Sequence, residues 1–384
     1  MRLKAFEGAK WAFLLSGVFF VLFISRIGIS PLLPSIEVYF GIRHVQAAGL
    51  FSWMSAGYIL GLFLSGLLAS FLSPRLMVFV SSMLSGAILL LVPLARGLGA
   101  ITVLLFCFGL TNGLYLPSGL ATLSAVIKPK DWGKAIAVHE FAPNLSFASA
   151  PMIVEVLLRY TGWKESLALL GLLCLLMGLL YLLLFPSRPI EASRPALSTF
   201  WDILNLEGTL RLIFLLGLGI GTSMGTYSVM PLYLQLEQGI PRTASNAMIS
   251  LSRLPGILMA SLSGWASDRL GPKRVMVASI ICASCFTVLL GASSGKWTVV
   301  LLFAQAFTVS AFFPALFLMV FRLVPEGLRS LTVSIITIFA MLIGAVFVPA
   351  FIGYVGDHCS IGWGIILTGV LFFLSSVLLK GLKA

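Results

Sequence analysis

The sequence predicts an all-helical membrane protein in which twelve transmembrane helices form two parallel six-helix repeats. Three observations predict this fold. Hydrophobic residues make up 59% of the chain and charged residues only 10%, whereas a soluble domain carries about 25% charged residues. Many apolar segments reach the length of about 20 residues that a helix needs to cross a bilayer. In addition, short motifs of the first half recur in the second half.

Twelve segments have the length and composition of membrane-spanning helices. We place them at residues 11–35, 46–72, 76–95, 98–127, 134–158, 163–185, 209–235, 243–267, 273–294, 297–323, 330–356 and 362–380. Between the sixth and the seventh of these segments, residues 187–208 form a long polar stretch that is rich in proline and arginine and cannot be a span. The expected organisation is therefore an N-terminal six-helix bundle (1–186), a cytoplasmic linker (187–208) and a C-terminal six-helix bundle (209–384).

The two halves match at several independent positions. The stretch SGLLASFLSPR at 65–75 lines up with SGWASDRLGPK at 263–273, and Gly162-Trp163 recurs as Gly362-Trp363. Two parallel repeats related by an axis along the membrane normal are a known transporter architecture, and its binding site lies near the bilayer midplane. The repeat therefore predicts a transporter.

The positive charge of the chain reports its orientation. The formal net charge is +12, but most of the 25 lysines and arginines fall in the segments that lie on the same side as the two termini. Cytoplasmic loops carry such an excess of basic residues. We therefore expect a monomeric multi-pass protein of a bacterial inner membrane, with both termini in the cytoplasm and the lipid bilayer, rather than nucleic acid, as its surroundings.

The sequence offers no pattern for an enzyme or for a primary pump. It has no nucleotide-binding loop, no metal-ligand cluster and no catalytic triad, and its three histidines are scattered. We therefore expect no cofactor and no metal. The energy for transport would come from a gradient, or the protein would only equilibrate its substrate.

One loop carries a family resemblance. The stretch GWASDRLGPKR at 264–274 resembles the signature loop G-x-x-x-D-R-x-G-x-[KR]-[KR] of the major facilitator superfamily. The residues that carry it are Gly264, Asp268, Arg269, Gly271, Lys273 and Arg274. The resemblance implies the major facilitator fold, alternating access, and a latching role for this loop at the inner gate. At the aligned loop of the first half, Ser70 and Phe71 replace the aspartate and the arginine, so we expect a weaker or different latch there.

Two arginines lie inside predicted spans, Arg26 in span one and Arg253 in span eight. At the bilayer centre an arginine costs at least about 2.5–3.5 kcal/mol unless it is paired or wetted. Its planar fork matches a carboxylate, phosphate or sulfonate. Arginines near these places resemble those of organic-anion carriers of the family. The alternative that each arginine pairs with an internal acid or with helix carbonyls stays open.

Polar and aromatic side chains recur on the spans that border the central cavity in that family. The expected substrate-binding residues are Arg26, Arg253, Tyr115, Asn112, Tyr227, Tyr58, Trp53 and Gln305. In lipid such side chains also bond across helices, so a packing role is the alternative for each of them.

Glu140 and His139 form a candidate proton-coupling pair near the cytoplasmic end of span five. A carboxylate in a span beside a histidine, which titrates near neutral pH, suits proton transfer. The alternative is that Glu140 binds a cytoplasmic base and locks the inner gate. Glu155 lies four residues before Arg159, which predicts a local ion pair.

The expected function is therefore secondary active or facilitative transport of a small organic anion, above all a carboxylate, with or without protons. The alternative is a proton-driven exporter of amphipathic drugs or lipids, which the 29 phenylalanines and 13 methionines favour. Cation exporters usually need an acid in the cavity, for which Glu140 is the candidate. A non-transporting sensor or scaffold is a third alternative.

Overall fold

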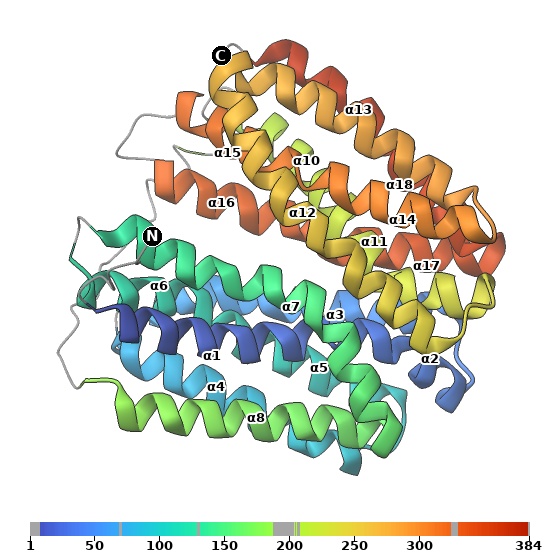
Figure 1. The fold of residues 1–384 in the computed structure, drawn as a ribbon. Helices are drawn as coiled ribbons and strands as arrows, with labels where there is room; N and C mark the ends of the chain where they lie inside the picture. The colour runs from blue at the N-terminus through green and yellow to red at the C-terminus, as the bar shows by residue number, and fades with distance from the viewer. Residues whose placement is uncertain are drawn as a thin grey trace, which may run out of the picture. The chain divides into compact units, whose positions relative to one another are not determined.

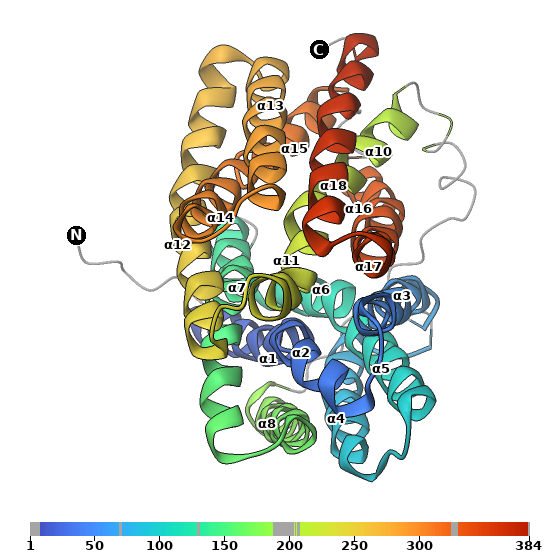
Figure 2. The same ribbon diagram turned by 90° about the vertical axis from the view of Figure 1, so that its right-hand side faces the viewer.

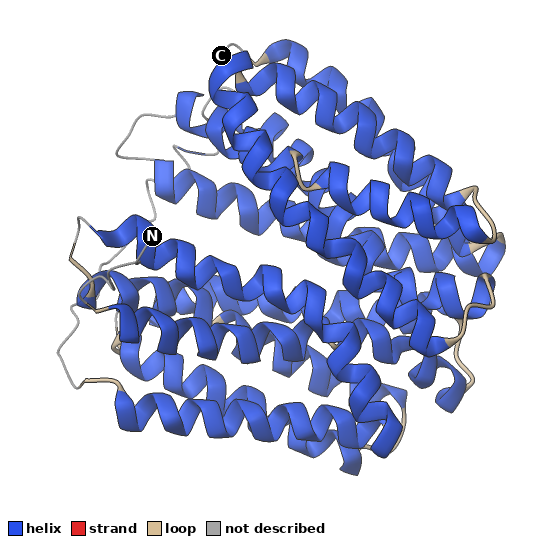
Figure 3. Cartoon of the chain, in the orientation of Figure 1, coloured by secondary structure: helices blue, strands red, loops and turns tan. Residues whose placement is uncertain are grey.

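The computed structural model describes residues 8–68, 71–128, 131–186, 203, 205, 208–323 and 329–382. Within these ranges the chain is helical apart from short turns, and it contains no strand (Figure 3). Most of the predicted linker at 187–208 lies outside these ranges.

Among the described residues of the first half, eight α-helices form (Figure 1). They are α1 (Ala9–Ile27), α2 (Ile29–Phe40), α3 (His44–Leu68), α4 (Pro74–Leu91), α5 (Leu98–Gly113), α6 (Tyr115–Val126), α7 (Trp132–Tyr160) and α8 (Trp163–Leu184). Span one is thus divided into α1 and α2, and span four into α5 and α6. Pro31 and Pro117 follow these breaks; because proline has no N–H, the carbonyl one turn earlier lacks its helical partner.

The second half repeats this pattern, and two of its spans also contain π-helical segments. It forms α10 (Thr209–Ile220), α11 (Thr226–Leu232), α12 (Arg242–Leu270), α13 (Pro272–Gly291), α14 (Lys296–Val309), α15 (Phe312–Leu323), α16 (Arg329–Met341), α17 (Val348–His358) and α18 (Ile361–Ser375). π-Helical segments continue spans seven and eleven at Gly221–Gly225, Tyr233–Glu237 and Leu342–Phe347. Pro314 follows the break between α14 and α15.

The predicted fold class is confirmed, because each expected span corresponds to one helix or to a run of consecutive helical segments. Among the described residues, eleven helices are long and apolar enough to cross a membrane. The remaining expected span is span eight, which corresponds to α12. This helix is equally long, but it carries Arg253, Asn246 and several serines and is therefore more polar. Span one extends to Phe40 rather than to residue 35, so Glu37 lies within its helix.

The chain forms two compact units. The N-terminal unit comprises Met1–Ile29 and Trp53–Pro195, and the C-terminal unit comprises Ser30–Ser52 and Ala196–Ala384. The division departs from the expected boundary at the linker, because residues 30–52 pack with the second half. The Ser30 hydroxyl donates to the carbonyl oxygens of Tyr227 and Ser228 at 3.1 and 3.0 Å, which attaches α2 to α11 (Figure 2).

The N-terminal unit packs α4 against α8 and α1 against α7. Its α3 and α5 meet at their backbones: a Cβ atom added at Gly109 would overlap the carbonyl oxygen of Met54, and one added at Gly61 would overlap that of Leu110. Small residues permit such close approach between membrane helices. The glycines therefore fix the distance between α3 and α5.

The C-terminal unit is built around α10, α13, α15 and α18. Its buried core includes Leu216, Met276, Phe312, Met319 and Phe372. Helix α13 packs against α18 and α14, and α12 packs against α14. The rings of Phe312 and Phe372 meet edge to face at 5.2 Å.

Large apolar side chains also cover the outside of both units. On α8 and α18 they include Leu172, Leu176, Leu183, Leu371, Phe373 and Leu374, each more than two-fifths exposed. Soluble monomers rarely expose such contiguous apolar surface. The surface is suited to lipid and supports a multi-pass membrane protein.

Candidate functional site

Arg26 is buried at the end of α1, in the N-terminal unit. Its side chain is only 1% exposed, and its guanidinium carbon lies 3.7 Å from the ring centre of Tyr58 on α3 and 5.8 Å from that of Phe23. Among the described residues, its Nε and Nη2 atoms have no hydrogen-bond partner. The guanidinium therefore lies among aromatic rings, with two nitrogens that bind no atom of the described residues.

Arg253 occupies α12 of the C-terminal unit and lies beside Tyr227 of α11. Its guanidinium carbon is 4.7 Å from the centre of that ring, and its Nη2 donates to the carbonyl oxygen of Ser223 at 3.3 Å. Ser223 belongs to the π-helical segment Gly221–Gly225. π-Turns interrupt the usual backbone pattern and occur often at functional sites.

The two units hold their arginines in an exchanged arrangement. In the N-terminal unit the arginine is on the first span and the tyrosine on the second, whereas in the C-terminal unit the tyrosine is on the first span of the repeat and the arginine on the second. A guanidinium that stacks on a ring keeps its N–H donors at its edge. Each pair can therefore present a fork to a planar oxyanion.

Two buried amides bind the backbone of the same spans. Asn112 donates from Nδ2 to the carbonyl oxygen of Leu22 at 3.0 Å, and Gln305 donates from Nε2 to that of Thr222 at 2.8 Å. Both side chains are at most 4% exposed. Leu22 lies one turn before Arg26, so Asn112 helps to fix the helix that carries this arginine.

Tyr115 and His139 lie in the core of the N-terminal unit. The tyrosine hydroxyl donates to the carbonyl oxygen of Leu15 at 2.7 Å and lies 3.1 Å from His139 Nε2, while the His139 ring stacks on Phe19 at 4.5 Å. His139 is fully buried. The side chain of Glu140 lies outside the described part of the structure, so the expected pair with His139 is not seen.

Trp53 is 56% exposed on α3, and its ring meets that of Phe106 edge to face at 6.3 Å. The predicted ion pair between Glu155 and Arg159 is confirmed, with 3.8 Å between Oε1 and Nε. Among the described residues no group of three metal-ligating side chains gathers.

The signature loop connects α12 to α13. Gly271 has a φ of +87°, a left-handed conformation that favours glycine, and it ends α12 just before Pro272 starts α13. Lys273 donates to the carbonyl oxygen of Leu382 at 2.8 Å, and Arg269 lies over the ring of Trp265 at 4.4 Å. Asp268 and Arg274 are exposed, and nothing lies within 4 Å of a Cβ added at Gly264.

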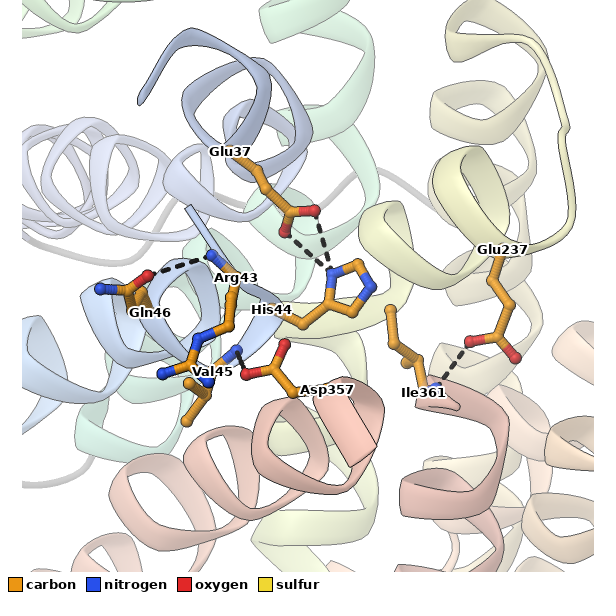
Figure 4. A network of polar contacts seen from close by, with 8 residues as sticks. All are labelled: Glu37, Arg43, His44, Val45, Gln46, Glu237, Asp357 and Ile361. Carbon is orange, nitrogen blue, oxygen red and sulfur yellow. Dashed lines mark hydrogen bonds and ion pairs between the residues drawn. The ribbon is translucent and has the colours of Figure 1, made fainter. Parts of the chain in front are cut away.

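A polar network that the sequence did not reveal lies in the C-terminal unit (Figure 4). His44 Nδ1 is 3.0 Å from both carboxylate oxygens of Glu37, and the backbone N–H of Val45 donates to Asp357 at 3.2 Å. A carboxylate at a helix N-terminus satisfies free N–H groups and complements the helix dipole. Asp357 of α17 thereby caps α3.

Glu237 makes a second cap of this kind. Its carboxylate accepts the backbone N–H of Ile361 at 2.6 Å and that of Gly362 at 3.2 Å, at the start of α18. The predicted spans end before Glu37, Glu237 and Asp357, whereas in the structure these three acids lie within apolar helices. The signal that could have found them is a carboxylate near a span end opposite the start of another span.

Replacing Glu237 by glutamine is expected to destabilise the protein by about 1–2 kcal/mol, because the cap of α18 loses its charge. Alanine at this position should cost more, since it removes the acceptor too. The measurement is thermal unfolding of the purified protein. Glu165→Gln is the matched control, because Glu165 lies in the first turn of α8, which begins at the other copy of the Gly-Trp motif. An equal loss of stability in this control would show that the charge at a first turn matters, and not the hydrogen bonds of the cap.

The chain matches the Major Facilitator Superfamily over residues 15–252 and 212–383. It is 25% identical over 272 residues to a probable sulfoacetate transporter of Cupriavidus necator, covering 66% of this chain and 63% of that protein. It is 21% identical over 310 residues to the 4-hydroxybenzoate transporter PcaK of Acinetobacter baylyi, covering 70% of this chain and 67% of the relative.

Solved structures show the same fold. A bacterial homologue of the lysosomal transporter Spinster, in an inward-facing and unoccupied conformation, superposes with a TM-score of 0.84, at 14% identity and covering 98% of both chains. The nucleoside transporter NupG gives 0.77 at 15% identity, covering 97% of this chain and 98% of that one. The family and its curated members are transporters, so the expectation that the chain is not an enzyme is confirmed. The protein belongs to the Major Facilitator Superfamily.

Proposed function

We propose that the protein is a secondary transporter that carries a small organic anion with a carboxylate group by alternating access. The observation that carries the proposal is the Arg26 guanidinium, which is buried while two of its nitrogens have no hydrogen-bond partner among the described residues. A charge in this position is costly unless something binds it. No carboxylate of the described chain forms an ion pair with it, so an anion from solution can bind there.

Arg253 supports the same substrate class in the C-terminal unit. It donates to the carbonyl oxygen of Ser223 through Nη2, and its guanidinium lies over the ring of Tyr227 as that of Arg26 lies over the ring of Tyr58. Asn112 and Gln305 hold the adjoining backbone in our proposal, and Tyr115 and Trp53 are candidate contacts of secondary rank. Sulfoacetate and 4-hydroxybenzoate, after which two relatives are named, both carry a carboxylate.

In this proposal the protein lies in a bacterial inner membrane, has both termini in the cytoplasm and acts as a monomer. The distribution of lysine and arginine supports the orientation. His139 and Glu140 are the proposed proton-coupling residues, and the signature loop at 264–274 is the proposed inner latch.

Anion binding is tested by thermal unfolding of the detergent-purified protein with sulfoacetate, 4-hydroxybenzoate, dicarboxylates, phosphorylated compounds, sugars and cationic amphiphiles. A ligand at about 100 times its dissociation constant stabilises the protein by about 2.7 kcal/mol. We expect carboxylates to act, and Arg253→Gln to weaken their binding roughly 10- to 100-fold, as loss of a charge-assisted hydrogen bond implies. The exposed Arg322, in the last turn of α15, provides the control Arg322→Gln.

One outcome would overturn the proposal, and a second would exclude one of its residues. Stabilisation by cationic amphiphiles with every anion silent would favour the exporter. Unchanged anion binding in Arg253→Gln would remove this arginine from the site. In proteoliposomes, anion uptake that an imposed proton gradient accelerates would show proton symport, and uptake that ignores the gradient would show a uniporter.

A further inference from the structure

An apolar groove runs along the surface of the C-terminal unit, between α12 and α13. Its volume is about 510 Å³, within the ~300–1,000 Å³ range of ligand sites. Leu262, Trp265 and Leu270 of α12 line one side, and Ala278 and Cys282 of α13 line the other. The three large side chains are 55–57% exposed, so the groove is open along its length.

One end of the groove is basic. Arg274 of α13 lines it there, is exposed, and makes no hydrogen bond or ion pair with the described part of the chain. Arg269 of the same loop holds its guanidinium carbon 4.4 Å from the centre of the Trp265 ring, which lines the groove. The acid nearby, Asp268, is a single charge against these two arginines and Lys273.

We propose that this groove binds an anionic glycerophospholipid, with an acyl chain between α12 and α13 and its phosphate on Arg274. Two features carry the proposal: the groove walls are apolar over most of their length, and Arg274, the charged residue that lines the groove, lies at its end beside the α12–α13 turn. This is the distribution of polarity along a phospholipid. Basic pockets between membrane helices on the cytoplasmic side bind anionic lipid headgroups.

The position of the basic end selects the leaflet. Lys273 donates to the carbonyl oxygen of Leu382, so the start of α13 lies beside Leu382, which follows the 3-10 segment Ser376–Gly381 after α18. With the termini in the cytoplasm, as the distribution of basic residues predicts, the headgroup belongs to the inner leaflet, whose surface is negative. The lipid is independent of the transported anion, because Arg274 and Arg253 are separate groups on different helices.

The occupied groove would also involve the signature loop. Arg269, Gly271, Lys273 and Arg274 all belong to that loop, so a phosphate on Arg274 would neutralise part of its charge. The lipid phosphate would thus be a ligand for Arg274 that substrate transport does not require.

The test uses lipids with brominated acyl chains, which quench tryptophan fluorescence on contact. The purified protein in detergent is titrated with brominated phosphatidylglycerol and, in parallel, with brominated phosphatidylcholine. We expect phosphatidylglycerol to quench at a several-fold lower mole fraction. Trp265→Phe should remove the component that saturates early, because Trp265 lies in the groove.

Two arginine variants separate a built site from general attraction. Arg274→Gln is expected to bring the two lipids to equal quenching, whereas Arg322→Gln, an exposed arginine at the end of α15, should leave the preference intact. Equal quenching by both lipids in the wild type would overturn the proposal. So would equal losses in the two arginine variants, which would indicate diffuse electrostatics. Size-exclusion profiles confirm that each variant is folded.

Discussion

Replacing Arg26 by methionine is expected to stabilise the ligand-free protein and to abolish its response to anions. The guanidinium is 1% exposed, and its Nε and Nη2 have no hydrogen-bond partner among the described residues. Replacing buried ionic groups by apolar side chains of similar volume often stabilises a protein by about 1–4 kcal/mol. A rise in melting temperature together with silence towards carboxylates would show that the protein gives up stability for this site.

Two further variants sharpen this result. Arg26→Lys keeps the charge but loses the planar fork, so it should retain weak anion binding without selectivity for carboxylates. Arg96→Gln, an exposed arginine before α5, is the control and should change neither property. A lower melting temperature for Arg26→Met would mean that Arg26 packs the helix ends, and the anion-binding role would lose its main support.

Replacing Gly109 by alanine is expected to destabilise the N-terminal unit by about 3 kcal/mol or more. Overpacking a core typically costs about 1–3 kcal/mol, and here the added methyl group would meet rigid backbone rather than a side chain that can move. The added Cβ would overlap the carbonyl oxygen of Met54 on α3, and Gly113 is placed in the same way against Tyr58. Helices α3 and α5 would have to separate. Since Tyr58 covers Arg26, anion binding should fall as well.

Gly66→Ala is the matched control for this substitution. It lies on α3, and nothing comes within 4 Å of an added Cβ, so the change should be neutral or stabilise the helix by about 0.5–1 kcal/mol. The comparison is made by thermal unfolding and by the yield of monodisperse protein. Equal behaviour of the two variants would show that α3 and α5 do not rely on backbone contact.

The fold could be predicted because a bilayer leaves few choices. Every backbone polar group must be bonded within a segment, so a long apolar stretch has to be a helix. The breaks were harder to foresee. Proline predicts the interruption at Gly28, but the π-helical segments at Gly221–Gly225 and Leu342–Phe347 come from packing between distant residues, since Val348 lies against Gly221.

The charged residues of the candidate site could be predicted from the sequence, but the residues that contact them could not. An arginine within an apolar stretch is conspicuous in a sequence, and Arg26 and Arg253 were identified on that ground. That each stacks on a tyrosine of a neighbouring helix depends on rotation about the helix axes, which the spacing does not determine. The cap of Asp357 on Val45 joins residues that are 312 positions apart, and a single sequence contains no signal for such a pair.

The chain crosses between the two compact units twice within its first sixty residues, near Ile29 and again near Ser52. The first crossing has a joint, because Gly28 interrupts the helix and Pro31 follows. The second lies within α3, an unbroken helix from His44 to Leu68 without a proline. If the units rotate as alternating access requires, span one can flex like a hinge, whereas α3 behaves as a stiff lever. Its first residues are fixed to α17 of the same unit by the hydrogen bond from Val45 to Asp357 and by close packing against Gly353, so any rotation between the units requires α3 to bend or this contact to break.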